Sequence, residues 1–206
     1  MTDHNSELEQ FRDMVRRFLD KEIKPHYDQW EKDGIIPKDV WLKMGENGLL
    51  CVDQPEDLGG SGVSYLYSMV VLEEASRANF ASLATGLSVH SDIVAPYVLH
   101  IGNDAQRQQW LPKIASGEVV GAIAMTEPGA GSDLQAIRTS AVRDGDHYIL
   151  NGSKTFITNG QHAGMVIVAA KTDPAAGAKG VSLFLVDMSL PGCARGRNLE
   201  KMGLHA

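Results

Sequence analysis

The segment GEVVGAIAMTEPGAGSD, residues 117–133, marks the point at which the sequence changes character. Before it, apolar residues recur at helical spacing, as they do between Leu8 and Ile23. After it, short β-rich runs such as residues 165–171 and 181–187 are separated by Gly, Asp and Asn. Helices first and strands second, without β-α alternation, predict an α+β protein and not a doubly wound fold.

We therefore predict an all-α domain over residues 1–118 and a small β domain, an antiparallel barrel or sandwich, over residues 119–206. The Asp-Gly pair within RDGDH (143–147) predicts a hairpin, and no parallel-sheet alternation is visible. The sequence stops at Ala206 without a closing strand, which leaves a sheet edge unpaired. We expect the chain to be a piece of a longer protein.

Charge and composition exclude several classes of function. The formal net charge is −7, so we expect neither nucleic acid nor an anionic membrane surface as a partner. No apolar stretch approaches the length of a membrane span. The two cysteines have no CxxC spacing, and the N-terminus resembles neither a signal nor a transit peptide. These features predict a cytoplasmic protein with reduced thiols.

The glycine-bearing segment TEPGAGSD (126–133) does not fit the two common phosphate-binding motifs. A Rossmann fingerprint would need a third glycine where Leu134 stands, and a P-loop would need Gly-Lys-Ser/Thr. Two interpretations are left. The glycines let backbone N–H groups approach a ligand, or the segment is a tight turn bonded to itself. The residues alone do not decide between them.

A second segment, NGSKTFITNG (151–160), has the same mixture of glycines, hydroxyls and amides, with one aromatic residue, Phe156. A flat conjugated ligand needs an apolar wall and polar groups at its rim. Two such segments on neighbouring strands are suited to line one face of that ligand.

At this point the sequence resembles a known family. AMTEPGAGSD (124–133) followed by ILNGSKTFITNG (149–160) is similar to the signature pair of the acyl-CoA dehydrogenase flavoproteins, in particular the long-chain members. Three more segments resemble that family: GLLCVDQPEDLGGSG, KGVSLFLVD and GRNLEKMGL. The resemblance implies a chain that holds the N-terminal and middle domains and is truncated before a C-terminal helical bundle.

The resemblance also implies which residues bind FAD. They are Ile123, Ala124, Met125, Thr126, Glu127, Pro128, Gly129, Ala130, Gly131 and Ser132 in the first motif, and Phe156, Ile157 and Thr158 in the second. Thr126 is expected to hydrogen-bond the pyrimidine edge of the flavin, where reduction builds up negative charge. Many relatives have Trp at the Phe156 position, so an indole N–H is lost here.

The resemblance also implies which residues lie near the substrate and where the catalytic base lies. Ser132 is expected near the CoA arm, and Ser88 and Ser91 in the small-residue stretch 81–99 near the acyl chain, although small residues also serve close helix packing. Glu127 is expected to be a structural member of its motif. No catalytic residue is expected in this chain, because the family's base, a Glu, lies in the C-terminal domain.

The implied reaction is FAD-dependent α,β-dehydrogenation of an acyl-CoA, with an electron-transfer flavoprotein as acceptor and a homotetramer as the assembly. This chain by itself is expected to be inactive. Two alternatives stay open: an acyl-CoA oxidase-type relative and a non-catalytic flavin- or CoA-binding module. The seven histidines show no metal-ligand spacing, so no metal is expected. A hydrolase triad through Ser132 lacks the G-x-S-x-G elbow.

Overall fold

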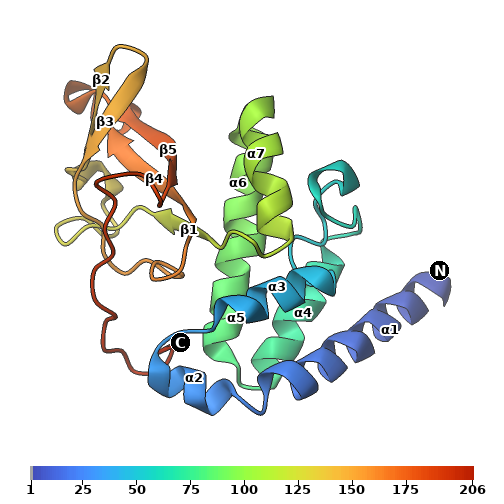
Figure 1. The fold of residues 1–206 in the computed structure, drawn as a ribbon. Coiled ribbons are helices and arrows are strands. Elements are labelled where there is room, and N and C mark those ends of the chain that lie inside the picture. The colour runs from blue at the N-terminus through green and yellow to red at the C-terminus, as the bar shows by residue number, and fades with distance from the viewer. Residues whose placement is uncertain (1) are drawn as a thin grey trace. The chain divides into compact units, whose positions relative to one another are not determined.

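The structure is a computed structural model that describes residues 2–206, with side chains described from residue 6 onward. It divides into two compact units, one reaching to Val120 and including Gly196–Ala206, the other Gly121–Arg195. The first unit is helical and the second is built on a sheet (Figure 1). The last eleven residues lie with the helices, because Asn198 Nδ2 donates to Gly34 O at 2.8 Å.

The helical unit contains seven α-helices among the described residues, together with short 3-10 and π segments. Their bounds are α1 Thr2–Phe18, a π segment Leu19–Ile23, α2 Tyr27–Asp33, α3 Lys38–Glu46, a 3-10 turn Glu56–Leu58, α4 Leu66–Arg77, α5 Ala81–Leu87, a π segment Ser88–Val94, α6 Ala95–Ile101 and α7 Asp104–Ala115. Asn103 caps α7 through a capping box with Gln106.

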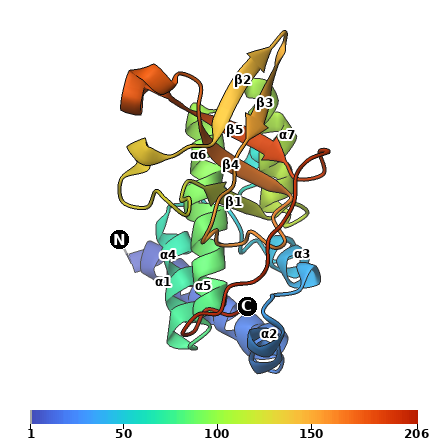
Figure 2. The ribbon, with the colours of Figure 1, turned by 90° about the vertical axis from the view of Figure 1, so that its left-hand side faces the viewer.

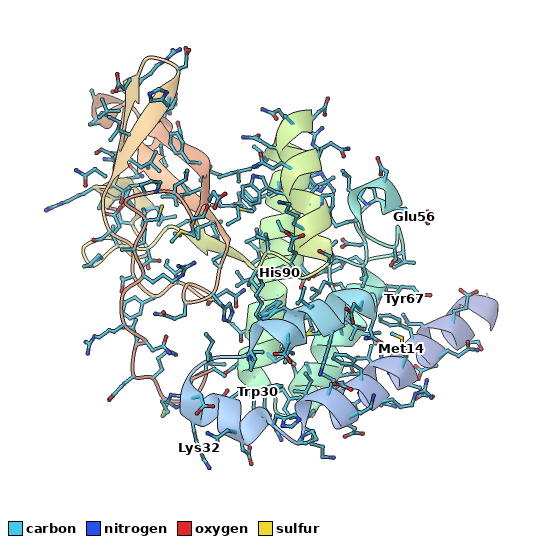
Figure 3. The ribbon with its side chains drawn as sticks, in the orientation of Figure 1. Met14, Trp30, Lys32, Glu56, Tyr67 and His90 are labelled. Carbon is cyan, nitrogen blue, oxygen red and sulfur yellow. The ribbon has the colours of Figure 1, made fainter. Side chains whose placement is uncertain are left out.

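Helices α1 and α4 pack side by side (Figure 1), and Met14 and Tyr67 lie where they meet (Figure 3). The ring of Phe11 contacts that of Tyr67 at a centroid distance of 5.0 Å. Glu74, only 5% exposed, accepts hydrogen bonds from the guanidinium groups of Arg12 and Arg16. Apolar contact and a buried charge cluster therefore hold these two helices together.

Helices α5 and α6 form one continuous rod through the π segment Ser88–Val94. Pro96 lies in the first turn of α6, inside this rod, and has no N–H to donate to the preceding turn. Just before it, Ala95 N donates to His90 O, five residues back. A π turn is thus placed where proline cannot continue the ordinary i→i−4 pattern, and the rod is not broken.

The second unit is a mixed sheet whose central strand is β4, Met165–Lys171. The other strands are β1 Gly121–Ala124, β2 Ser140–Asp144, β3 His147–Asn151 and β5 Val181–Asp187, with 3-10 segments Leu134–Ala136 and Pro174–Gly180. β5 pairs antiparallel with β4 along its whole length, while β1 pairs with β4 in parallel. β2 and β3 form the predicted hairpin (Figure 2), which joins β4 in parallel at Ser140 and Lys171.

The antiparallel barrel or sandwich predicted from the sequence is therefore not the sheet observed, which is mixed and open. Between β1 and β4 the chain forms the glycine loop, the β2–β3 hairpin and the segment 152–164. This long connection brings β4 back beside β1, so the two strands run in the same direction. The continuous apolar run of β4 is the matching sequence feature. Both of its faces are largely buried, as is usual for a strand with parallel pairing, and not alternately exposed.

The core of the sheet unit is thin and anchors the glycine loop. Ala130 in that loop packs with Ile137 and with Ala169 of β4, and Met125 lies against the same cluster. A second cluster joins Ala122 and Ala124 of β1 to Ala163 and Val166. The loop after β1 is thus held to the sheet by small buried side chains at both ends.

No helix in the described part of the chain is both long and apolar enough to cross a membrane.

Candidate cofactor-binding site

The loop that follows β1 begins with a turn closed by its own backbone. Glu127 N donates to Ala130 O at 2.9 Å, and Ala130 N donates to Glu127 O at 3.1 Å. Pro128 and Gly129 occupy the tip, and proline pre-sets φ for the first central position of such a turn. The self-bonded turn left open by the sequence is therefore present over residues 127–130.

The turn does not account for its glycines. Neither Gly129 nor Gly131 has a positive φ, and a Cβ on either would meet no atom within 4 Å. By contrast, a Cβ on Gly152 would lie 2.3 Å from Thr139 Oγ1. The fold itself requires no glycine at positions 129 and 131. Both are exposed, so a ligand can approach the backbone closely there.

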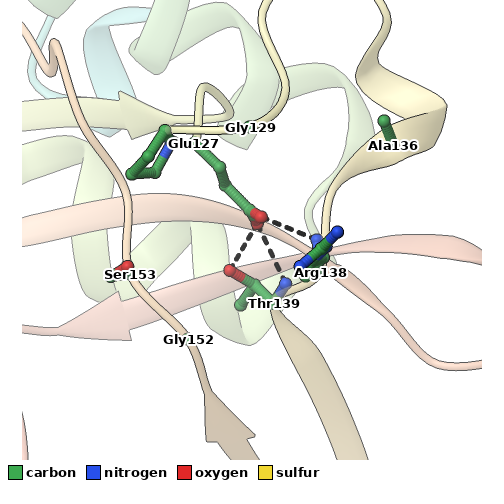
Figure 4. Close-up of a pocket in the computed structure, with 8 residues that line it drawn as sticks. Glu127, Gly129, Ala136, Arg138, Thr139, Gly152 and Ser153 are labelled. Carbon is green, nitrogen blue, oxygen red and sulfur yellow. Dashed lines mark hydrogen bonds between the residues drawn. The ribbon is translucent and has the colours of Figure 1, made fainter.

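The Glu127 carboxylate is held by four donors from the protein. Arg138 N donates to Oε2 at 2.6 Å, and Thr139 N and Oγ1 donate to Oε1 at 2.9 and 2.6 Å (Figure 4). Lys154 Nζ adds a fourth bond to Oε1 at 2.9 Å. Burial by itself raises the pKa of Glu127, but these donors outweigh it and hold the pKa at about 2. Glu127 is thus an ionised structural group at neutral pH and not a base.

The second motif is joined directly to the first. Lys154 Nζ donates to Met125 O at 3.0 Å as well as to Glu127, and Thr155 N donates to Thr126 O at 2.9 Å. The two segments that the sequence predicted to line one ligand therefore lie side by side in the same unit.

Both motifs contain hydrogen-bond donors that the protein leaves unused. Within the described chain, Thr126 and Thr158 have no partner for either the backbone N–H or the hydroxyl, and the hydroxyl of Ser132 is also unpartnered. Phe156 precedes Thr158 by two residues in the second motif. Its side chain is 72% exposed and its φ is 58°. A bulky residue with positive φ is a strained position of the kind that clusters at ligand sites.

The predicted cofactor contacts differ in exposure. The exposed ones are Pro128, Gly129, Gly131, Ser132 and Phe156. Those of intermediate exposure are Ile123, Met125, Thr126, Ile157 and Thr158. The buried ones are Ala124, Glu127 and Ala130, whose side chains serve the core or the carboxylate cluster.

Ser88 and Ser91 lie on the π segment of the helical unit. Ser91 is 5% exposed, and its Oγ accepts a hydrogen bond from Cys51 N at 3.1 Å. Cys51 has a positive φ of 51°, so this bond supports a strained backbone position. The Ser91 hydroxyl thus has a partner within the protein, and the contact of Ser88 and Ser91 with the acyl chain stays a prediction.

Three groups of this site were not identified from the sequence: the backbone N–H of Arg138, both donors of Thr139, and Lys154. They surround Glu127 from 11, 12 and 27 residues away, so no local spacing could have paired them. Beside them is a hollow of about 340 Å³ (Figure 4), lined by Glu127, Pro128, Gly129, Ala136, Arg138, Thr139, Gly152 and Ser153. Among the described residues, no group of three or more His, Cys, Asp or Glu side chains is placed to hold a metal ion.

Almost the whole chain matches domains of known proteins. Residues 5–118 match the family model described as "Acyl-CoA dehydrogenase, N-terminal domain", and residues 122–206 match "Acyl-CoA dehydrogenase, middle domain". The mouse long-chain specific acyl-CoA dehydrogenase is 47% identical over 204 residues, which are 98% of this chain and 47% of the mouse protein. The chain thus spans about half the length of the curated relatives it matches.

Solved structures agree with this assignment. An acyl-CoA dehydrogenase from Geobacillus kaustophilus is 54% identical, with a TM-score of 0.94 over 97% of this chain and 53% of that one. A structure titled as the electron transferring flavoprotein of Acidaminococcus fermentans is 37% identical, with a TM-score of 0.91 over 96% of this chain and 52% of that one. A glutaryl-CoA dehydrogenase from Mycobacterium smegmatis, in complex with FADH2, is 29% identical, with a TM-score of 0.88 over 97% of this chain and 50% of that one.

The cytoplasmic location predicted from composition and from the N-terminus is contradicted by these comparisons. The curated relatives, the mouse protein among them, are named as mitochondrial enzymes. The cysteine pattern was the wrong evidence for a compartment, because reduced thiols do not distinguish the cytoplasm from the mitochondrion.

Proposed function

Since the chain belongs to the acyl-CoA dehydrogenase family, we propose that it is part of an FAD-dependent oxidoreductase that dehydrogenates an acyl-CoA between its α and β carbons. One observation of the structure carries this proposal. The two glycine-bearing motifs are joined by the hydrogen bond from Thr155 N to Thr126 O, and the N–H and hydroxyl of Thr126 are left without a partner in the described chain. The FADH2 bound by the related glutaryl-CoA dehydrogenase is the kind of group that suits these donors.

The residues present fit a flavin. When bound, FAD supplies the acceptor for the hydride that leaves the β carbon. Thr126 and Thr158 offer donors to the polar rim of the ring, and Phe156 and Ile157 offer an apolar wall. The glycines let backbone N–H groups come close to the cofactor, and Ser132 serves the cofactor and the CoA arm of the substrate.

Fixed donors at the flavin rim also explain how this chain promotes the reaction. Negative charge develops on the reduced ring, and preorganised N–H and O–H groups stabilise it without reorganisation. Thr126 and Thr158 supply such groups. Glu127 takes no part in proton transfer, because its pKa of about 2 leaves it without affinity for a proton at neutral pH. The base that removes the α proton belongs to neither of the two motifs.

We propose the domain bounds, the substrate contact, the electron acceptor and the assembly on the same basis. Residues 1–118 form the N-terminal domain and residues 119–206 belong to the middle domain. Ser88 borders the acyl chain. The electron acceptor is an electron-transfer flavoprotein and the assembly is a homotetramer. The matched relatives include long-chain, isovaleryl and short-chain enzymes, so the length of the acyl chain is left to experiment.

Because this chain by itself is expected to be inactive, the proposal is tested on a longer protein that also carries the helical domain expected to hold the base. That protein is reconstituted with FAD and titrated anaerobically with acyl-CoAs of several lengths. We expect a bound flavin spectrum that bleaches on addition of substrate. The acyl chain that bleaches it at the lowest concentration identifies the preferred length. Oxygen consumption measured in parallel with reduction of an artificial acceptor separates an oxidase from a dehydrogenase. A protein that retains no FAD and does not alter acyl-CoA overturns the proposal.

A further inference from the structure

The backbone on both sides of Thr126 is fixed by hydrogen bonds. Its two flanking peptides are each held at the carbonyl: Lys154 Nζ donates to Met125 O at 3.0 Å, and Thr155 N donates to Thr126 O at 2.9 Å. The N–H of the second peptide, that of Glu127, donates to Ala130 O at 2.9 Å. The orientation of both peptide planes is therefore set by partners that surround Thr126.

Peptide geometry converts this into an orientation for the free donors. In a trans peptide the C=O and the N–H point in opposite directions, and no peptide in the described chain is cis. When Lys154 takes Met125 O on one side, the N–H of Thr126 must point to the other. With both flanking planes fixed, the φ and ψ of Thr126 are fixed too, and its hydroxyl starts from a defined Cβ.

The ammonium of Lys154 is itself fixed by Glu127. Its side chain is 9% exposed, and its Nζ lies 2.9 Å from Glu127 Oε1, which also accepts both donors of Thr139. A buried charge must be paired, so moving the Lys154 ammonium into solvent would break its ion pair with the buried carboxylate of Glu127. The result is a chain of contacts from Thr139 through Glu127 and Lys154 to the carbonyl of Met125.

We propose that Lys154, held by Glu127, is a positioning residue for the cofactor: it turns the N–H and hydroxyl of Thr126 toward the flavin. The inference rests on the proposed function. It predicts that Lys154 affects the affinity and the redox behaviour of the flavin without touching it. A purely structural lysine would affect the stability of the unit and nothing more.

The test compares two substitutions in the full chain. Lys154→Met keeps the length of the stem and removes the donors, and it leaves Glu127 with three other donors. We expect the Kd for FAD to rise about tenfold, the equivalent of one good hydrogen bond, and the reduction potential of bound flavin to fall. Thr172→Val is the control. It removes a hydroxyl of the same unit that bonds Gly180 O and Ser182 Oγ, and it leaves the contacts of Glu127 and Lys154 intact. It should therefore lower Tm and leave both flavin properties unchanged.

A readout without cofactor separates this inference from the proposed function. Amide exchange measured by NMR on the FAD-free protein should accelerate about tenfold at Thr155 in Lys154→Met, because its acceptor is no longer held in place. The amide of Met188, which donates to Gly164 O at 2.9 Å, serves as the internal reference and should not change.

The outcomes decide as follows. Unchanged FAD affinity, potential and Thr155 exchange in Lys154→Met overturn the positioning role, as does an equal loss of FAD affinity in Thr172→Val. A wild-type protein that binds no FAD overturns the proposed function, and the exchange experiment then decides the role of Lys154 alone. If Lys154→Met does not fold, Lys154→Gln replaces it with the same expectations, because its side chain is too short to span both acceptors.

Discussion

Thr139 donates twice to one oxygen of Glu127, through its backbone N–H at 2.9 Å and through its hydroxyl at 2.6 Å. This pairing closes the loop that leaves β1 and returns to the start of β2. The contacts that fix the glycine turn are thus made by Glu127 at its start, and not by the residues at its tip. The tip, where Pro128 and Gly129 lie, is left exposed. The loop thus combines a rigid base with an accessible backbone.

The Glu127 cluster predicts how stability depends on pH. The pKa of Glu127 is lowered from 4.5 to about 2 in the folded protein, so its contribution to stability is fully present above pH 4.5 and is lost as the pH falls through 2. Relative to wild type, Glu127→Gln should lower the free energy of unfolding by on the order of 2–3 kcal/mol at pH 7. That difference should shrink steadily toward pH 2 in denaturant titrations. Glu118→Gln, an exposed control, should change little; a Glu127→Gln deficit that does not vary with pH would contradict the argument.

The contact between α1 and α4 gives a second prediction. Arg12 is 14% exposed and bonds to Glu73 and Glu74, whereas Arg16 is 44% exposed and bonds to the same Glu74. Arg12→Met should cost about 1–3 kcal/mol, because it leaves a buried carboxylate with less compensation. Arg16→Met should cost less, since solvent can replace an exposed donor. Thermal unfolding measures both, and an equal loss in the two variants would show that burial does not decide the strength of this cluster.

The division into helices and strands was predictable from the sequence, but the direction of the strands was not. Periodicity predicts the type of an element, and it identified β4 and β5 as strands. It contains no information on which neighbour pairs in which direction. The parallel pairing of Gly121 with Met165 depends on the path of 43 intervening residues. The unbroken apolar character of β4 was the available signal for a central strand with parallel pairing.

For the site, the sequence predicted the two segments and the structure supplies their connection. Lys154 and Thr139 look like ordinary polar residues in the sequence, because their partner Glu127 is far away along the chain. For Gly129 and Gly131 the residues alone left two interpretations, and the resemblance implied contact with FAD. Whether a glycine serves its own backbone or leaves space for a ligand depends on what surrounds it, and only coordinates show that.

The glycines of the site give a third prediction, which separates folding from binding. Gly131→Ala places a methyl group in open space at a position without positive φ, so stability should stay within about 0.5 kcal/mol of wild type. FAD affinity should fall, because the methyl group occupies the space proposed for the cofactor. Differential scanning fluorimetry and flavin fluorescence titration measure the two effects on the same preparation.

Gly152→Ala is the matched control for that experiment. Its new Cβ would lie 2.3 Å from Thr139 Oγ1 and 2.7 Å from Thr139 Cα. We expect a loss of about 1–3 kcal/mol from overpacking, visible as a lower Tm even without FAD. If Gly131→Ala behaves in the same way as Gly152→Ala, with lost stability and no specific loss of FAD affinity, the open space beside Gly131 has no role in binding.

Phe156 gives the last prediction, in which stability and binding change in opposite directions. Its ring is 72% exposed and its φ is 58°, a conformation that costs a bulky residue about 1–2 kcal/mol and costs glycine almost nothing. Phe156→Gly removes little buried surface and relieves that strain, so we expect the free energy of unfolding to stay equal or rise. The same change removes the apolar wall proposed for the flavin ring, so FAD should bind more weakly. Val142→Gly, at a side chain that is 62% exposed on β2, is the control. It should lower stability, because glycine weakens a strand, and leave FAD affinity as it was. A Phe156→Gly protein that binds FAD as tightly as wild type would mean that the exposed ring is not part of the cofactor site.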